Sequence, residues 1–168
     1  KKPVMADRIG FFLPKTFAKI DNESGTAVFI GMVLYTFQLY ADFSGCIDII
    51  SGVSEMFGIK VAENFKQPFF SKSIDEFWRR WHISLGAWLK EYVFYPVSLS
   101  GHFKKVNTFT KKHIKSQHIV GFITIAYTLF FVWFCNGLWH GASCPSIVYG
   151  LYYYVLMILG KFTEPYTD

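Results

Sequence analysis

The chain has 168 residues and a formal net charge of +5, and hydrophobic residues make up 52% of it. Charged residues account for only 17%, against about 25% in an ordinary soluble domain. An aromatic content of 20% excludes a disordered chain, and so few polar side chains cannot coat a freely soluble globule. The length allows one domain at most, and the chain opens at Lys1 without a signal-peptide pattern. We therefore expect a partial domain of a larger membrane protein.

Residues 1–25 mix basic and apolar residues, which is typical of a juxtamembrane or interfacial segment. The following segment, 26–50, is long and apolar enough to form one membrane-spanning helix. Its acids, Asp42 and Asp48, are predicted to lie near one end of the span or to face the protein interior. Gly45 and Gly52 permit close approach or a break, after which a second helix or half-helix could follow.

An amphipathic helix is predicted next. Ser73, with a glutamate three residues later, forms a capping-box pattern, so the helix is expected to start there. Along 77–90 the large apolar side chains share one broad face, basic side chains lie opposite, and His82 lies at the border. Such a helix is too basic to span lipid, so we predict that it lies in the interface or re-enters partway. Pro96 is expected to end or kink it.

A basic segment covers residues 102–118. Five lysines and three histidines lie there, and no acid interrupts them. Because a long apolar run follows at once, we interpret the segment as a cytoplasmic loop beside a membrane span, in contact with anionic lipid. Nucleic acid is not an expected partner.

Residues 116–160 contain no aspartate, glutamate, lysine or arginine. Two spans fit this run, 119–139 and 146–160, with a tight connection at 141–145. The predicted fold is therefore all-α: polytopic membrane helices with an interfacial or re-entrant amphipathic helix, in a multi-pass protein of the cell membrane.

Two histidines are the main candidates for chemistry. His140 ends the charge-free run, where an ionisable group marks a functional site by default, and an imidazole there suits general-base work. An interfacial histidine with one edge in water is the alternative. His82 is either a second reactive group or a helix-edge histidine satisfied by lipid headgroups. A zinc site made by these two residues would lack the usual third ligand, so no metal is predicted.

Other polar residues allow more than one interpretation. Arg79 and Arg80 could hold phosphates of a lipid or a cofactor, or could form a solvated basic face. Asp42 and Asp48 could be interior partners for those arginines or could lie near the membrane surface. Sequence signatures of serine hydrolases, P-loop proteins and dinucleotide-binding proteins are absent. Three cysteines without CxxC spacing support neither a disulfide framework nor a zinc ribbon.

Three motifs in order resemble the membrane-bound O-acyltransferase family. They are Asp42-Phe43-Ser44-Gly45 followed by Asp48, then Phe77-Trp78-Arg79-Arg80-Trp81-His82-Ile83-Ser84-Leu85, then Gly137-Leu138-Trp139-His140-Gly141-Ala142. The resemblance covers about residues 35–100 and 119–160 and is closest to the bacterial branch of alginate O-acetyltransferase and the D-alanyl transfer protein of teichoic acid synthesis. It implies that the chain is the central to C-terminal part, 1–168, of one such domain.

The resemblance also implies a reaction. The family's near-invariant histidine falls on His140 and a second family position falls on His82, so these two are the predicted catalytic residues. Residues in or beside the motifs are predicted to support the site or bind substrate: Arg79, Arg80, Trp81, Asp42, Asp48, Asn136 and Trp139.

An acyl group, acetyl by expectation, would pass from a thioester donor to a hydroxyl of an extracytoplasmic polysaccharide or cell-wall polymer. The donor would be acyl-coenzyme A or an acyl carrier protein, the acceptor glycan would arrive through a partner protein, and no bound cofactor is expected. The alternatives are D-alanyl transfer to teichoic acid by the same mechanism, a non-enzymatic polytopic transporter, and a purely structural membrane subunit.

Overall fold

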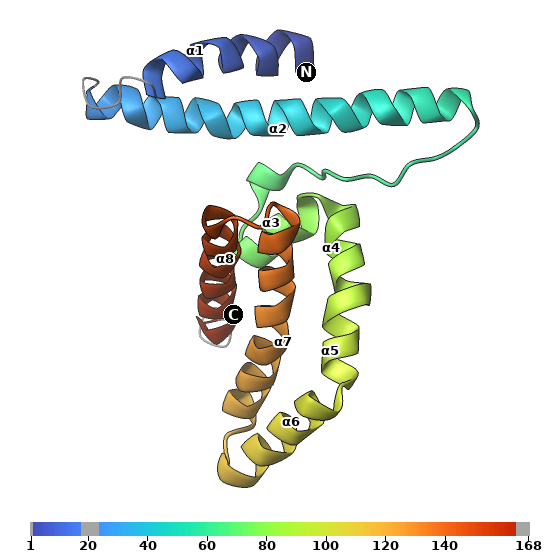
Figure 1. Cartoon of the computed structure of the whole chain (residues 1–168), viewed down its shortest axis with the longest axis vertical. Coiled ribbons are helices and arrows are strands. Elements are labelled where there is room, and N and C mark those ends of the chain that lie inside the picture. Colours follow the sequence, from blue (N-terminus) through green and yellow to red (C-terminus); the bar gives the residue numbers. More distant parts are fainter. Residues whose placement is uncertain (1, 18–23, 164–168) are drawn as a thin grey trace. The chain divides into compact units, whose positions relative to one another are not determined.

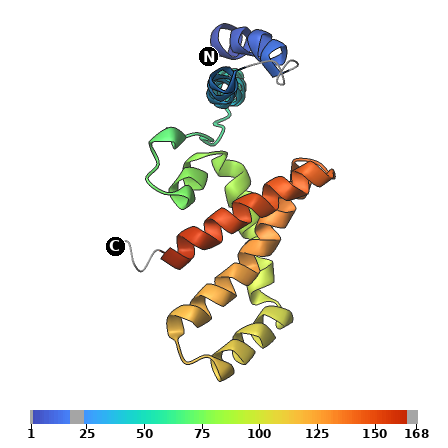
Figure 2. The same ribbon diagram turned by 90° about the vertical axis from the view of Figure 1, so that its left-hand side faces the viewer.

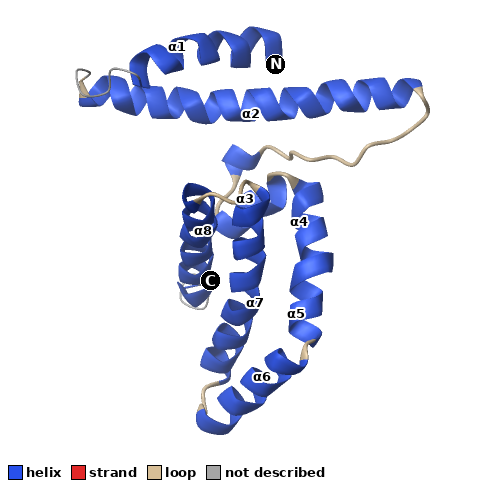
Figure 3. Cartoon of the chain, in the orientation of Figure 1, coloured by secondary structure: helices blue, strands red, loops and turns tan. Residues whose placement is uncertain are grey.

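A computed structural model describes residues 2–17 and 24–163, and it divides the chain into two compact units, Lys1–Asn64 and Phe65–Asp168. Within the described ranges the structure is helical and no strand occurs (Figure 3). Three of the helices are long and apolar enough to cross a membrane: α2 (Gly25–Met56), α7 (Gln117–Trp139) and α8 (Cys144–Thr163). The three spans expected from the sequence are thus confirmed, each with slightly wider bounds.

The first unit is a pair of helices. A short π-helical turn (Lys2–Ala6) leads into α1 (Asp7–Phe17), which packs along α2 (Figure 1). The hydroxyl of Ser24 caps α2 by accepting the N–H of Ala27 at 3.2 Å. Gly52 does not break α2, which runs without interruption to Met56. The α-helical hydrogen bonds tolerate an isolated glycine at a modest cost in stability.

The second unit begins with an isolated antiparallel bridge between Phe65 and Trp81 and a 3₁₀ turn (Pro68–Phe70). Then follow α3 (Ile74–Arg80), α4 (Ile83–Leu89), a π-helical turn (Lys90–Phe94), α5 (Tyr95–Leu99) and α6 (Gly101–His113). The predicted start near Ser73 is confirmed, since its hydroxyl accepts the N–H of Glu76 at 3.1 Å.

The continuous helix expected over 77–90 is wrong, because it breaks at Trp81 and His82. Trp81 is extended, its backbone pairs with Phe65, and the two rings meet edge to face at 5.0 Å. His82 then adopts a left-handed conformation with φ 47°. The bridge and the ring contact form only in the folded unit. The spacing of apolar residues over 77–90 therefore does not predict the break.

The basic segment, expected as a loop, is also corrected, since most of it is helix α6. Ser100 caps this helix by accepting the N–H of Phe103, and its last turn holds Lys111 and Lys112, whose positive charges favour a helix C-terminus. Pro96 does not end the preceding helical stretch, α4 and the π-helical turn. It is the second residue of α5, and the helical backbone passes from the π-helical turn into α5 without a gap.

The two C-terminal spans form a tight hairpin (Figures 1 and 2). Gly137 on α7 faces Gly150 on α8, and a Cβ added at Gly150 would lie 2.4 Å from the Trp133 carbonyl oxygen. Small residues at such a crossing let two helix backbones approach closely, as in other membrane helix pairs. This contact fixes the end of α7, which carries His140.

Candidate active site

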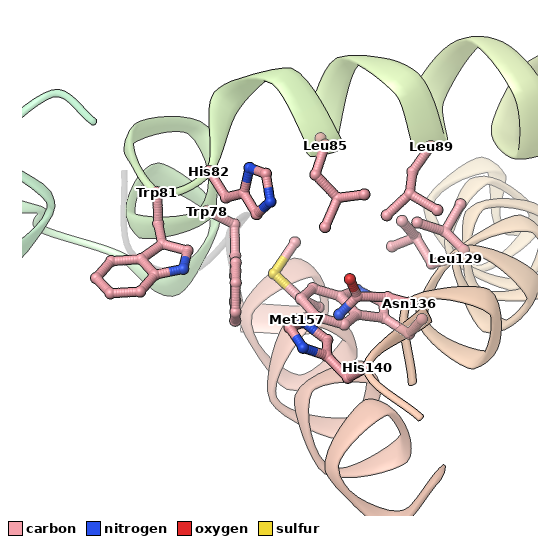
Figure 4. Close-up of a pocket in the computed structure, with 12 residues that line it drawn as sticks. Trp78, Trp81, His82, Leu85, Leu89, Leu129, Asn136, His140 and Met157 are labelled. Carbon is pink, nitrogen blue, oxygen red and sulfur yellow. The ribbon is translucent and has the colours of Figure 1, made fainter. Parts of the chain in front are cut away.

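A cavity of about 150 Å³ lies inside the second unit, between α3 and α4 on one side and α7 on the other. Figure 4 shows His82, Leu85 and Leu89 on the first side, and Leu129, Asn136 and His140 opposite them. Most of the remaining lining is apolar or aromatic: Trp78, Trp81, Gly86, Val132, Trp133 and Met157. Three polar side chains therefore meet in an otherwise apolar cavity, which is the usual composition of a small-molecule site.

His82 reaches the cavity because of the helix break. A non-glycine residue with positive φ is uncommon, and such strained positions concentrate at functional sites. The imidazole also meets the Trp139 indole edge to face, with ring centroids 5.7 Å apart. The backbone carbonyl of His82 accepts the N–H of Gly86, which starts α4 directly after the break.

His140 follows the last residue of α7. Its backbone N–H donates to the Asn136 carbonyl at 3.2 Å, which continues the helical hydrogen bonding by one residue. The ring lies edge to face against Trp139 at 5.0 Å and against Tyr149 of α8 at 5.2 Å. Trp139 thus contacts both imidazoles, that of His82 between α3 and α4 and that of His140 at the end of α7.

Asn136 is the third polar group of the cavity. The residue is only 4% exposed and lines the cavity. The amide N–H groups can donate to a bound oxygen.

Burial sets the protonation state of both histidines. It lowers the pKa of the His82 imidazole below its ordinary value of 6.5, and the charge of a protonated His140 lowers it further. Burial likewise lowers the pKa of His140. Both rings are therefore neutral at pH 7, and each can accept a proton at one nitrogen and donate a hydrogen bond from the other.

The predicted arginines have partners on their own helix. Arg79 pairs with Asp75 at 2.8 Å and Arg80 pairs with Glu76, so both are held on α3 and neither is among the cavity lining. Trp81 lines the cavity.

Asp42 and Asp48 lie on α2 in the first unit. Asp42 pairs with Lys2 at 2.6 Å, so its partner there is a lysine of the same unit.

Sequence reasoning did not single out the aromatic walls, Trp78 and Trp133. Trp78 packs edge to face against Trp133 at 4.9 Å and against Tyr153 at 4.7 Å. Trp78 belongs to the apolar face of α3, and that face was the sequence feature that could have identified it as part of the cavity wall. In the described ranges no group of three or more His, Cys, Asp or Glu side chains is arranged to hold a metal ion.

Comparison with known proteins gives the family. The sequence profile of the membrane-bound O-acyltransferase family matches residues 9–111. The chain belongs to this family. It is 38% identical to a Pseudomonas fluorescens protein named "Probable alginate O-acetylase AlgI" over 96% of the chain and 29% of that protein. It is 42% identical to the teichoic acid D-alanyltransferase of Bacillus subtilis over 77% of the chain and 30% of that protein.

A peptidoglycan O-acetyltransferase of Helicobacter pylori is 35% identical over 90% of the chain. The chain spans about 29% of the length of the first of these relatives. Family membership together with the three spans makes it a membrane protein of an acyltransferase family.

Proposed function

We propose that this chain carries the reacting histidines of an O-acyltransferase that moves a short acyl group onto a hydroxyl of an extracytoplasmic polymer. The observation that carries the proposal is the cavity shared by His82, Asn136 and His140, three polar side chains from separate helices within apolar walls. Family membership supplies the reaction class.

His140 is proposed as the general base. Its imidazole takes the proton of the acceptor hydroxyl while that oxygen attacks the thioester carbonyl carbon. The tetrahedral intermediate then expels the thiolate, the imidazolium returns its proton to the sulfur, and the ester and a free thiol remain. A positioned base of this kind contributes typically about 10²–10⁴-fold to the rate. The lowered pKa of His140 keeps the ring unprotonated and ready to act at pH 7.

His82 and Asn136 are proposed to stabilise the oxyanion. A neutral imidazole and a carboxamide each offer an N–H donor, and both line the cavity opposite or beside His140. Donors held in an apolar cavity are worth more than in water, and loss of one such donor costs about 10²–10³-fold in kcat. Trp139, in edge contact with both imidazoles, would hold their relative orientation.

Substrate identity is proposed from the relatives. Of the three relatives described, two are named for O-acetylation of alginate or peptidoglycan, and one is named for D-alanylation of teichoic acid. We propose acetyl transfer to a cell-envelope glycan, from acyl-coenzyme A or an acyl carrier protein on the cytoplasmic side, with D-alanyl transfer as the alternative. A partner protein would present the acceptor on the far side of the membrane.

The test compares His140→Gln with the wild-type protein in its native membrane. The assay measures transfer of an isotope-labelled acyl group to surface glycan by mass spectrometry, with the protein level checked in each strain. We expect His140→Gln to lose at least about 100-fold in transfer rate. The matched control His118→Gln changes an exposed histidine at the start of α7 and should keep the wild-type rate. Wild-type transfer by a stably inserted His140→Gln protein would remove this residue from the mechanism, and flux of an unmodified substrate without labelled product would favour a transporter.

A further inference from the structure

Helix α6 carries a cationic surface that the acyl-transfer site does not use. We define the lysine face as Lys104, Lys105, Lys111, Lys112 and Phe109, all of them exposed. At 100° per residue, two i, i+7 pairs place these lysines along the two edges of one outward side of the helix. The opposite side packs against α7, where the rings of Phe103 and Tyr127 lie 6.2 Å apart.

No ion pair neutralises the charge of this face in the part of the chain that the structure describes. Among the described residues, none of its four lysines takes part in an ion pair, and the sequence from 92 to 163 contains no acid at all. Four positive side chains on two turns repel one another, so an anionic surface outside the chain would stabilise them. The lysines elsewhere on the chain show no comparable concentration without acids.

Phe109 gives the face an apolar component. Its side chain is 66% exposed, and its ring lies 4.2 Å from the His113 ring on the outer surface of the helix. An aromatic ring beside lysines is typical of helices at the boundary between headgroups and acyl chains, where the ring enters the apolar layer and the lysine stems extend towards phosphates.

The position of α6 favours lipid as the occupant. Only residues 114–116 separate its end at His113 from the start of the candidate span α7 at Gln117. The end of a span lies at the membrane surface, so a helix tethered to it by three residues and packed along its first turns is held among the headgroups.

We infer that the lysine face of α6 binds the anionic headgroups of the membrane leaflet at the start of α7. Phosphodiester headgroups supply the negative charge, and the leaflet receives Phe109. A soluble acidic protein or a nucleic acid would satisfy the lysines but would leave this ring in water. This surface does not depend on the acyl-transfer reaction, so either proposal can fail while the other stands.

The experiment uses the chain in detergent, titrated with phosphatidylglycerol or phosphatidylcholine, and native mass spectrometry counts the lipids that each protein molecule retains. The test variant replaces the four α6 lysines with glutamine. The matched control replaces Lys60, Lys66, Lys72 and Lys90, which are also exposed, and so removes the same charge elsewhere. Since each lysine at an anionic surface contributes about a fivefold gain in binding, the α6 variant should lose at least about tenfold in preference for phosphatidylglycerol.

Two further arms make the result decisive. Phe109→Ser should weaken retention of phosphatidylglycerol while leaving the charge unchanged. A purely electrostatic site for a protein or a nucleic acid would not need the Phe109 ring. In nanodiscs, amine-reactive labelling should be slower at the α6 lysines when part of the phosphatidylcholine is replaced by phosphatidylglycerol. Equal lipid preference of the wild type and the α6 variant, or equal loss in the matched control, would overturn the inference. Protection of the α6 lysines that appears only when an acidic protein is added would assign the face to a protein partner instead.

Discussion

Replacing Gly150 by alanine should loosen the α7–α8 hairpin that holds His140. The new Cβ would lie 2.4 Å from the Trp133 carbonyl oxygen and 3.0 Å from the Gly137 Cα, both of them backbone atoms that cannot rotate aside. Restoring ordinary separation moves α8 away by roughly 1 Å, and a gap of that size forfeits a quarter to a half of the dispersion energy between the facing atoms.

Overpacking of this kind costs about 2 kcal/mol, which corresponds to a fall of roughly 4–8 °C in Tm for a chain of this length. The assay is thermal unfolding in detergent, followed by helical circular dichroism at one fixed scan rate. Gly121→Ala is the matched control in α7, because a Cβ there meets no atom within 4 Å among the described residues. The control should be neutral or slightly more stable, since alanine has the higher helix propensity. A Tm for Gly150→Ala equal to or above that of the wild type would refute the close crossing of the two helices.

Two further predictions concern the cavity. The acid limb of the pH profile of kcat/KM should have its midpoint below pH 6.5, because burial lowers the pKa of His140 and the base acts only when neutral. Initial rates of acyl transfer in isolated membranes measure this profile. A midpoint above pH 6.5 would contradict a buried base. Asn136→Leu keeps the side-chain size but removes the donors, so kcat should fall about 10²-fold with little change in KM. A rise in KM at constant kcat would instead make Asn136 a ground-state binding residue.

Much of the architecture could be predicted from local sequence. Runs without charge located α2, α7 and α8, because burying an ionised side chain in lipid is costly enough to leave a clear pattern. The start of α3 was predictable as well, since a capping box acts over only four residues.

The errors have a common physical origin. The basic segment was expected as a loop because its charge was weighed above its lack of helix breakers, although lysine is a good helix former and Ser100 supplies a cap. The break at His82 directly follows the bridge between Trp81 and Phe65. These two residues are sixteen positions apart, so no local sequence pattern predicts their contact. The meeting of His82 and His140 likewise requires the packing of α4 against α7, so only the family resemblance predicted it.

A double-mutant cycle tests the central claim most directly, namely that the two imidazoles serve one reaction centre. His82→Gln, His140→Gln and the double variant are compared in native membranes by the rate of labelled acyl transfer to surface glycan, with a detection limit well below the slower single variant. We predict strong non-additivity: the double variant should be little slower than the slower single variant, because residues that act as a unit are lost together. Losses that simply multiply, or a wild-type rate in either single variant, would contradict a shared centre.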